Sequence, residues 1–410
     1  MKRIAIIGNG PSGSALGTFL REKGMEVTLF TNERRPDLIV GESLIPAIIP
    51  VLRRLGVEER VAEIGVYKPG VSFVMSPEEK IDFCFQPVAA CHLPTYSYNV
   101  PRPGFDRVIE ERAIEAGVTR VVHQAKIEGD GPDRVRLAPE TLAAAPSLGG
   151  RQPDFIVDAS GRSRMFARAL GIPAKLGSRK DVAHFAHFEG FAPEEPRGQV
   201  LIGRMNAGWC WRIPLRGRLS VGIVMNKDEI ARLGATPEER LEAAIRNDPS
   251  LAAAAGDARR VTDVATYSNY QLVSERGHGA NWAMVGDAFG FVDPMLSPGM
   301  WLALHSAEIL ADNLTRPAVY AAKMNELIGA WMELIELYYD GRMFAMYHTG
   351  VKLEQRWNMW LSRFMHRHVE THIACMASGA TTSSAYGRGV IRFLSKHFVG
   401  TEDLAGLSIR

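Results

Sequence analysis

The first thirty residues constrain the fold of this 410-residue chain more than any other stretch. Residues 4–7 form a short apolar run that is typical of a buried parallel strand, and residues 14–20 continue as an apolar helix. A second strand-like run follows at residues 25–30. The turn between the first strand and the helix has the G-x-G-x-x-G spacing of a dinucleotide-binding unit. That turn is Gly8-Asn9-Gly10-Pro11-Ser12-Gly13.

The residues of this turn have separate physical roles. Gly8 permits the tight turn, Gly10 lets the backbone approach a diphosphate, and Gly13 lets the helix pack closely on the strand. The diphosphate would bind unpaired N–H groups at the positive end of the helix, beside Pro11 and Ser12. The first thirty residues therefore predict a dinucleotide site.

The acidic residue that normally binds the ribose is less clear in this sequence. The fingerprint calls for Asp or Glu at the end of the second strand, but Thr31 and Asn32 occupy that place. Glu33 lies twenty residues beyond Gly13 and is the candidate ribose ligand. A solvated charged turn at Glu33 is the alternative.

Composition is that of an ordinary globular protein longer than one average domain. Hydrophobic residues make up 46% and charged residues 23% of the chain. The net charge of +2 gives no reason to expect nucleic acid or an anionic membrane as a partner. No leader precedes the first strand, and no apolar run approaches the roughly 18 residues of a membrane span, so we expect a cytoplasmic protein. The four cysteines show no C-x-x-C pairing, so the sequence indicates neither a disulfide framework nor a zinc site.

Six further motifs follow along the chain, at the ends of predicted strands, within them or at the start of predicted helices. The last of them is separated from the first glycine turn by about 280 residues. The motifs are Gly41-Glu42-Ser43-Leu44-Ile45-Pro46, Lys68-Pro69-Gly70-Val71-Ser72-Phe73, Arg102-Pro103-Gly104-Phe105-Asp106, Asp158-Ala159-Ser160-Gly161-Arg162-Ser163, Trp209-Cys210-Trp211-Arg212-Ile213-Pro214 and Gly286-Asp287-Ala288.

On these residues the sequence resembles the flavin-dependent halogenases and their relatives among the aromatic flavoprotein monooxygenases. In that family a G-E-S-x-x-P segment lies along the flavin, which implies that Glu42 and Ser43 contact the cofactor. A K-x-G-x-x-F segment carries the lysine of the halogenation step, and Lys68 is the matching residue. A solvated lysine on an edge strand is the alternative for Lys68.

The arginine motif is similar to the family's segment that places an arginine near the cofactor, which implies this role for Arg102. A structural arginine paired with Asp106 or Glu110 is the alternative. We expect the following helix over residues 107–116. The D-A-S-G-x-S element resembles the family segment that lies near the flavin, where small residues let the backbone pass close by.

The tryptophan motif matches the W-x-W-x-I-P motif of flavin-dependent halogenases completely, whereas geranylgeranyl reductases have a looser version. Because side chains alternate along a strand, Trp209 and Trp211 are expected on one face, where they would form the wall of a cavity. A plain buried strand face is the alternative.

The last motif resembles the second cofactor fingerprint of the glutathione-reductase-like flavoproteins. By that resemblance Asp287 would meet the ribityl chain of FAD, and the turn containing Pro294 would lead into a helix after Pro298. The N-terminus of this helix, with Gly299 and Met300, would point at the pyrimidine edge of the flavin. Its dipole would stabilise negative charge on the reduced flavin. Because no second G-x-G-x-x-G is present, we expect FAD without a separate nicotinamide domain.

The predicted fold class is α/β: a glutathione-reductase-like FAD-binding Rossmann domain interleaved with a β-sheet substrate domain and followed by a C-terminal helical region. The predicted boundaries are 1–75, 100–175 and 260–325 for the FAD-binding domain, 76–99 and 176–259 for the substrate-binding sheet, and 326–410 for the helical region.

The resemblance implies two chemistries that this scaffold can host, so the fold alone does not choose between them. In a monooxygenase, a flavin C4a-hydroperoxide transfers OH to an electron-rich aromatic carbon. In a halogenase, chloride captures that oxygen as hypochlorous acid, which Lys68 then relays. A geranylgeranyl-reductase-like FAD enzyme is a further alternative.

Lys68 and the tryptophan pair favour halogenation, whereas two residues of the last turn favour hydroxylation. Halogenases hold the halide against backbone amides of this turn, and Pro298 has no N–H to offer. Leu296 stands where tryptophan halogenases have a glutamate. We therefore predict aromatic hydroxylation, with halogenation as the alternative. The candidate catalytic residues are Lys68, Trp209, Trp211 and Pro298.

The expected substrate is an indole, phenol or pyrrole ring, either small and free or tethered to a carrier or a protein, for example a peptidyl tryptophan. NADH or NADPH would supply electrons, directly or through a flavin reductase, and O2 would be the co-substrate. The sequence does not identify the substrate or the oligomeric state.

Overall fold

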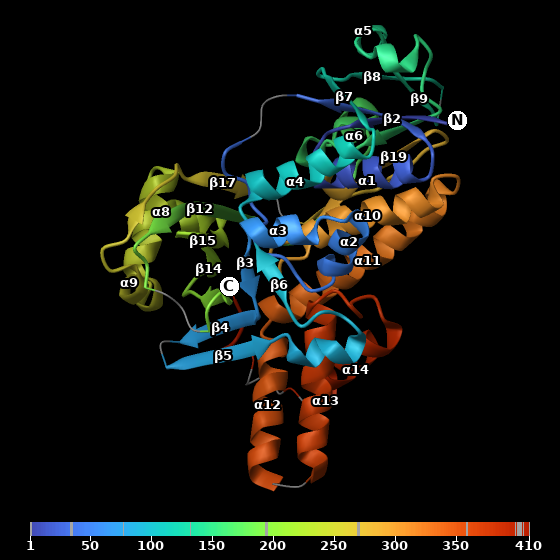
Figure 1. Ribbon diagram of the computed structural model, residues 1–410. Helices are drawn as coiled ribbons and strands as arrows, with labels where there is room; N and C mark the ends of the chain where they lie inside the picture. The colour runs from blue at the N-terminus through green and yellow to red at the C-terminus, as the bar shows by residue number, and fades with distance from the viewer. Residues whose placement is uncertain are drawn as a thin grey trace.

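In the computed structural model, the described residues form two large sheets, three small sheets and a C-terminal helical region (Figure 1). The mixed α/β architecture is the one predicted from the sequence. The structure describes residues 2–32, 36–76, 78–131, 133–192, 196–268, 271–357, 360–397, 399, 404 and 406–409.

The first sheet is parallel and has the strand order β19-β10-β1-β2-β7. The N-terminal strand β1 is its central strand and pairs with β10 and β2. Continuous apolar runs form its central strands because both faces of these strands are covered. The strands are β1 (Arg3–Ile7), β2 (Glu26–Thr31), β7 (Thr119–Val122), β10 (Phe155–Asp158) and β19 (Trp282–Met284).

Three helices pack together against this sheet, and each starts at a motif found in the sequence. Helix α1 (Pro11–Glu22) packs between α4 (Arg102–Glu115) and α10 (Gly299–Asn313). Helix α4 begins five residues earlier than the predicted start at residue 107, so Arg102 is its first residue. Pro103 does not delay the helix, because proline in the first turn lacks only an N–H that would have no partner there.

The second sheet is mostly antiparallel and has the order β16-β12-β15-β14-β13-β4-β5, with β17 paired to β12. Among the described strands of this sheet, β13 and β4 form the one parallel pair. Its strands are β4 (Gly70–Ser76), β5 (Glu79–Cys84), β12 (Asp181–Glu189), β13 (Val200–Arg204), β14 (Trp209–Leu215), β15 (Arg218–Asn226), β16 (Arg259–Arg260) and β17 (Ala265–Ser268).

Alternation along β14 assigns its side chains to two different cores. Trp209 and Trp211 belong to the main hydrophobic core, whereas Cys210 packs in a separate core with Leu241 and Leu251. The latter two come from α8 (Pro237–Asn247) and α9 (Pro249–Ala255), which cover the outer face of the sheet (Figure 1). Both tryptophans therefore lie on one face, as predicted.

The domain boundaries given by the sequence stay a prediction. Strands β4 and β17 belong to the second sheet, although their residues lie in ranges assigned to the FAD-binding domain. The structure describes further short elements that connect the layers. They are α2 (Ile48–Leu55), α3 (Glu58–Ile64), β3 (Val66–Lys68), β6 (Ser97–Asn99), β8 (Ile127–Gly129), β9 (Val135–Leu137), α5 (Pro139–Ala143), α6 (Met165–Ala169), β11 (Ala174–Leu176), α7 (Lys227–Ile230), β18 (Leu272–Ser274) and β20 (Gly290–Phe291).

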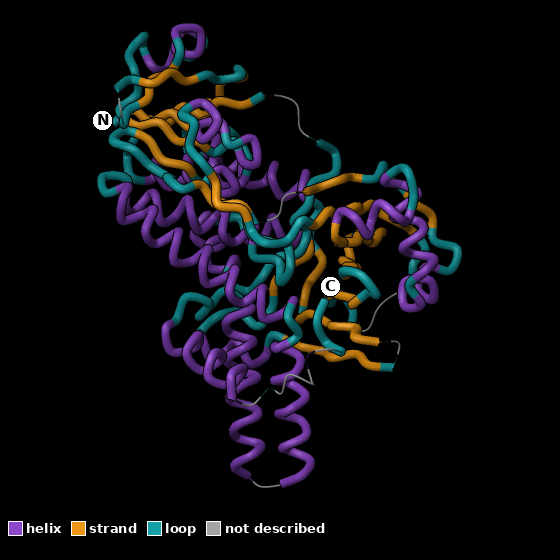
Figure 2. The backbone as a smooth tube through the Cα atoms, turned by 180° about the vertical axis from the view of Figure 1, so that it is seen from behind, coloured by secondary structure: helices purple, strands orange, loops and turns teal. Residues whose placement is uncertain are grey.

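Four helices form the C-terminal region: α11 (Pro317–Tyr339), α12 (Arg342–Trp357), α13 (Trp360–Ala377) and α14 (Ala385–His397). Helices α12 and α13 lie antiparallel and project from the rest of the molecule in both views (Figures 1 and 2). Among the described residues, no helix is long and apolar enough to cross a membrane.

The structure contains a disulfide bond, although the cysteine spacing in the sequence indicated no disulfide framework. Cys91, in the 3₁₀ helix Gln86–Cys91, forms a disulfide with Cys375 of α13. The two residues are 284 positions apart, so spacing in the sequence gave no sign that they would meet. The expectation that no disulfide would form is therefore corrected.

The glycine turn after β1 supplies a test of the fold. A Cβ atom on Gly13 would lie 2.0 Å from the carbonyl oxygen of Gly8, whereas one on Gly10 would have nothing within 4 Å. We expect Gly13→Ala to lower the free energy of unfolding by about 1–3 kcal/mol through overpacking. Gly10→Ser, a favourable helix N-cap, should change it by only a few tenths of a kcal/mol. Urea unfolding of the flavin-free proteins measures both values, and equal stability of the two variants would contradict this packing.

Candidate active site

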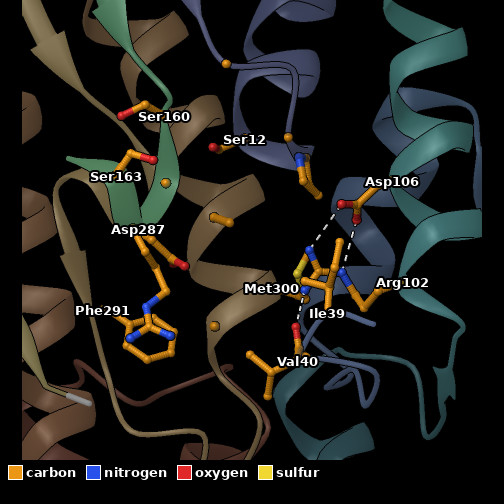
Figure 3. Close-up of a pocket in the computed structure, with 18 of the residues that line it drawn as sticks. Ser12, Ile39, Val40, Arg102, Asp106, Ser160, Ser163, Asp287, Phe291 and Met300 are labelled. Atoms are coloured by element: carbon orange, nitrogen blue, oxygen red, sulfur yellow. Dashed lines mark hydrogen bonds and ion pairs between the residues drawn. The ribbon is translucent and has the colours of Figure 1, made fainter. Parts of the chain in front are cut away.

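A cavity of about 1020 Å³ lies where the carboxyl ends of the first sheet meet the inner face of the second sheet. The glycine turn after β1, residues 39–43 and the turn after β10 line one part of it. Strands β13 and β14 and residues 291–300 line the other part. Side chains from both groups of elements converge in Figure 3. The motifs scattered along the sequence therefore meet at one place.

The nucleotide end of this cavity fits a diphosphate. The first backbone hydrogen bond of α1 joins the Ser14 N–H to the Gly10 carbonyl, so the N–H groups of Ser12 and Gly13 have no partner within the helix. Ser12 lies at the cavity in Figure 3. Because nothing fills the space beside Gly10, a bound diphosphate can approach its backbone. Glu33, the candidate ribose ligand, lies outside the described residues, whereas Thr31 and Asn32 line the cavity.

Arg102 lines the cavity and is also paired within the protein. Its Nε donates to Oδ1 of Asp106 at 3.0 Å, and its guanidinium also donates to the Val40 carbonyl (Figure 3). Glu110, the other partner considered, instead accepts from Asn9. The structural pairing therefore exists, and contact of Arg102 with the cofactor stays a prediction.

Asp287 follows β19 and faces the cavity in Figure 3. Burial raises the pKa of its carboxyl to about 6, while the positive charges of Arg102 and Arg162 lower it. Within the described part of the chain, no group donates a hydrogen bond to this carboxylate. The hydroxyl groups of a ribityl chain would provide such donors, which agrees with the role that the resemblance implies.

The turn before α10 has an unusual backbone. Leu296 and Ser297 both lie in the left-handed region, with φ of 64° and 58°, a conformation that costs energy for residues other than glycine. The first hydrogen bond of α10 joins the Leu302 N–H to the Pro298 carbonyl at 2.9 Å. The N–H groups of the first helical turn, next to Pro294 and including Gly299 and Met300 on the cavity wall, are thus available to an anionic flavin edge.

The two tryptophans line the cavity with ring surface only. Nε1 of Trp209 donates to Oη of Tyr339 at 2.9 Å, and Nε1 of Trp211 donates to Oγ of Ser220 at 3.2 Å. Their exposed fractions are 2% and 5%, and their ring centroids lie 5.8 Å apart. Because both indole N–H groups are already used, this wall is apolar toward a ligand. Sequence reasoning did not find Tyr339.

Lys68 is buried, with only 3% of its surface exposed, so the alternative of a solvated lysine is wrong. Its Nζ donates to Oγ of Ser43 at 2.7 Å and to the Leu44 carbonyl at 2.9 Å, and it faces the ring of Phe85. Burial lowers the pKa of this amine to about 7. Ser43 lines the cavity, and Lys68 lies directly behind it.

Glu42 has a partner that sequence reasoning missed. Nε2 of His187, on β12, lies 2.6 Å from Oε1 of Glu42, and both side chains are buried. Nothing in the sequence pairs this histidine with Glu42, because the two residues are 145 positions apart. Because Glu42 lines the cavity, His187 holds a carboxylate at its wall. The described residues contain no group of three or more side chains that could hold a metal ion.

Comparison with known proteins identifies the family. The family profile described as tryptophan halogenase matches residues 3–92 and 75–382. The chain belongs to this family. It is 30% identical over 319 residues to the tryptophan 2-halogenase of Chondromyces crocatus, a match that covers 75% of this chain and 60% of that relative. It is 28% identical over 379 residues to the 1H-pyrrole-2-carbonyl-[peptidyl-carrier protein] chlorinase of Pseudomonas fluorescens, covering 82% and 83%.

Solved structures confirm the fold of a flavin-dependent halogenase. The flavin-dependent brominase Bmp2 superposes with a TM-score of 0.73 at 20% identity, covering 97% of this chain and 98% of that chain. A variant of halogenase PltM in complex with FAD gives 0.74 at 17% identity, covering 96% and 90%. The family and the cavity together support FAD as the cofactor. The relatives favour halogenation, the alternative chemistry, over the hydroxylation predicted first.

The diphosphate end of the cavity supplies a second prediction. We expect Gly10→Val to keep the folded protein but weaken FAD binding at least about a hundredfold, because the side chain would occupy the space beside the turn. Gly129→Val, at the end of β8, also has open space around its Cβ and is the matched control. Flavin fluorescence titration measures both affinities. Full flavin content in a folded Gly10→Val protein would show that the diphosphate binds elsewhere.

Proposed function

We propose that this protein is an FAD-dependent halogenase of an electron-rich aromatic ring, in which Lys68 relays the halogen. The observation that carries this proposal is the position of Lys68. It is buried directly behind Ser43 at the cavity wall, and its described hydrogen-bond partners are two neutral oxygens.

The surroundings of Lys68 suit the chemistry of a relaying amine. Only a neutral amine has the lone pair that can attack the halogen of a hypohalous acid, and burial without a nearby carboxylate favours the neutral form. Reduced FAD bound in the cavity would supply the two electrons that activate O2, and the activated oxygen would oxidise halide to hypohalous acid. Nζ would then take the halogen and release water, and the aromatic carbon would take the halogen from nitrogen in exchange for its proton.

The tryptophan wall suits a flat, electron-rich ring. Because the N–H groups of Trp209 and Trp211 are bonded within the protein, the wall offers ring faces and excludes water. We infer that an indole, pyrrole or phenol ring stacks here. The named relatives act on tryptophan and on a pyrrole attached to a carrier protein, so a tethered ring is included in the proposal. NADH or NADPH and a flavin reductase remain the proposed electron source.

A second candidate function, aromatic hydroxylation, is favoured by one observation. Pro298 removes a backbone donor from the turn where the resemblance places the halide, and Leu296 adds no polar group. A desolvated anion that loses hydrogen bonds is costly. If the remaining donors at Gly299 and Met300 are insufficient to hold a halide, oxygen would reach the ring directly.

Product analysis decides between the two chemistries. The holoenzyme is supplied with NADH, a flavin reductase, labelled O2 and bromide, together with free and carrier-tethered indole, pyrrole and phenol rings. We expect mass spectrometry to find bromine in the product and no labelled oxygen. Lys68→Met should lower bromination at least about a hundredfold while retaining FAD, whereas Lys175→Met, an exposed lysine on β11, should leave it unchanged.

Labelled oxygen in the product, without bromine, would overturn the halogenase proposal in favour of hydroxylation. Bromination that persists in Lys68→Met would remove Lys68 from the mechanism.

A further inference from the structure

A chain of hydrogen bonds runs behind the tryptophan wall. Nε1 of Trp209 lies 2.9 Å from Oη of Tyr339, which lies 2.9 Å from Oδ2 of Asp293. An indole N–H can only donate, so the tyrosine hydroxyl accepts from it and gives its single proton to the carboxylate. Each donor and acceptor in this chain thus has one fixed role.

The tyrosine in the middle of the chain is held on several sides. Tyr339 is the last residue of α11, and its carbonyl accepts from the N–H of Ile409 at 2.8 Å. The guanidinium of Arg179 lies 3.9 Å from the centre of its ring and also bonds Asp181 at 2.5 Å. The hydroxyl of Tyr339 is therefore a rigid attachment point for the indole.

The carboxylate at the end of the chain also organises the turn before α10. Oδ1 of Asp293 accepts the N–H of Met295 at 2.9 Å, while Oδ2 accepts from Tyr339. Asp293 is only 1% exposed. The next two residues, Leu296 and Ser297, have the left-handed backbone described above. Such a backbone persists only when its surroundings hold it, and the bond from Asp293 to Met295 contributes to this.

Tyr339 and Asp293 thus connect two walls of the cavity. Trp209 is part of the second sheet, whereas the turn leads into α10, which packs on α1 beside the first sheet. Neither Tyr339 nor Asp293 touches the cavity directly; each acts through a neighbour that lines it, Trp209 in one case and the turn with Ser297 in the other.

We propose that Tyr339 and Asp293 are positioning residues that hold the Trp209 ring and the 294–299 turn at one separation and orientation. The ring that stacks on Trp209 is thereby presented to the reactive group in a single pose. This proposal rests on the proposed function, because it takes Trp209 as the substrate wall, but it holds for transfer of either halogen or oxygen. Loss of the link would let the indole rotate and the substrate adopt several poses.

The test compares two tyrosines that are neighbours in the sequence. Tyr339→Phe removes only the hydroxyl group that links Trp209 to Asp293 by hydrogen bonds. Tyr338→Phe removes the hydroxyl of the adjacent tyrosine, whose ring packs on Phe73 and Phe344, and is the matched control. Both variants are made in the FAD-loaded protein.

The first measurement tests the link itself, independently of any activity. In the NMR spectrum of the indole N–H groups, the Trp209 signal is assigned with Trp209→Phe. We expect Tyr339→Phe to shift this signal and to speed its hydrogen exchange at least about tenfold, while Tyr338→Phe leaves it in place. An unchanged Trp209 signal would overturn the link.

The second measurement tests the positioning role through kcat and the distribution of product isomers, which would not change if Tyr339 only stabilised the fold. We expect Tyr339→Phe to lower kcat/KM about tenfold, mainly through kcat, and to spread the product over more than one ring position. In a Trp209→Phe variant, which lacks the indole donor, Tyr339→Phe should lower kcat/KM by less than about a further twofold. If the Trp209 signal shifts but the ratio of product isomers and the amount of product formed per O2 consumed stay unchanged, Tyr339 is not a positioning residue.

Failure of the proposed function is distinguishable from these outcomes. If the unmodified enzyme forms neither halogenated nor hydroxylated product from any ring, the proposed function and the positioning role built on it are both wrong. The NMR measurement then still shows whether the Tyr339 hydroxyl holds Trp209.

Discussion

The backbone contact between the glycine turn after β1 and the segment Asp158-Ala159-Ser160-Gly161 at the end of β10 is the constraint on which the cavity depends. A Cβ on Gly8 would lie 2.2 Å from the carbonyl oxygen of Ala159, and one on Gly13 would lie 2.0 Å from the carbonyl oxygen of Gly8. Only hydrogen side chains allow β1, α1 and the turn after β10 to come this close. That approach places unpaired helix N–H groups at the sheet edge, where the segments with Glu42, Asp287 and Gly299 also meet.

The cavity is polar at the glycine turn and apolar at the tryptophan wall. Lys68 lies behind Ser43, which lines the cavity, and the burial of this lysine has a thermodynamic cost. The pKa of Lys68 is about 7 in the folded state, below the unfolded value of about 10.5. At pH values between these two, the unfolded chain therefore binds more protons than the folded protein. The penalty is complete below pH 7 and is relieved as pH rises toward 10.5. The proposed relay needs the same neutral amine that burial favours.

Local patterns in the sequence predicted most of the fold and part of the site. The glycine turn, the alternation that puts Trp209 and Trp211 on one face, and the second fingerprint all depend on residues close in the chain. Contacts between distant segments could not be predicted in this way. His187 contacts Glu42, which is 145 positions away in the sequence. Tyr339 accepts a hydrogen bond from Trp209, which is 130 positions away. The burial of Lys68 depends on Ser43 and Phe85. The comparisons favour halogenation over the hydroxylation predicted from Pro298, because one residue in a turn carries less information than a match over most of the chain.

The pKa of Lys68 in the FAD-loaded protein tests the central claim most directly. Nitrogen NMR of ¹⁵N-lysine-labelled protein, with the Lys68 signal identified by Lys68→Met, follows the titration of each side chain. We expect Lys68 to titrate with a midpoint near 7 and the exposed lysines to titrate near their usual value of about 10.4. A Lys68 signal that titrates together with the exposed lysines would contradict a buried neutral amine and the relay assigned to it.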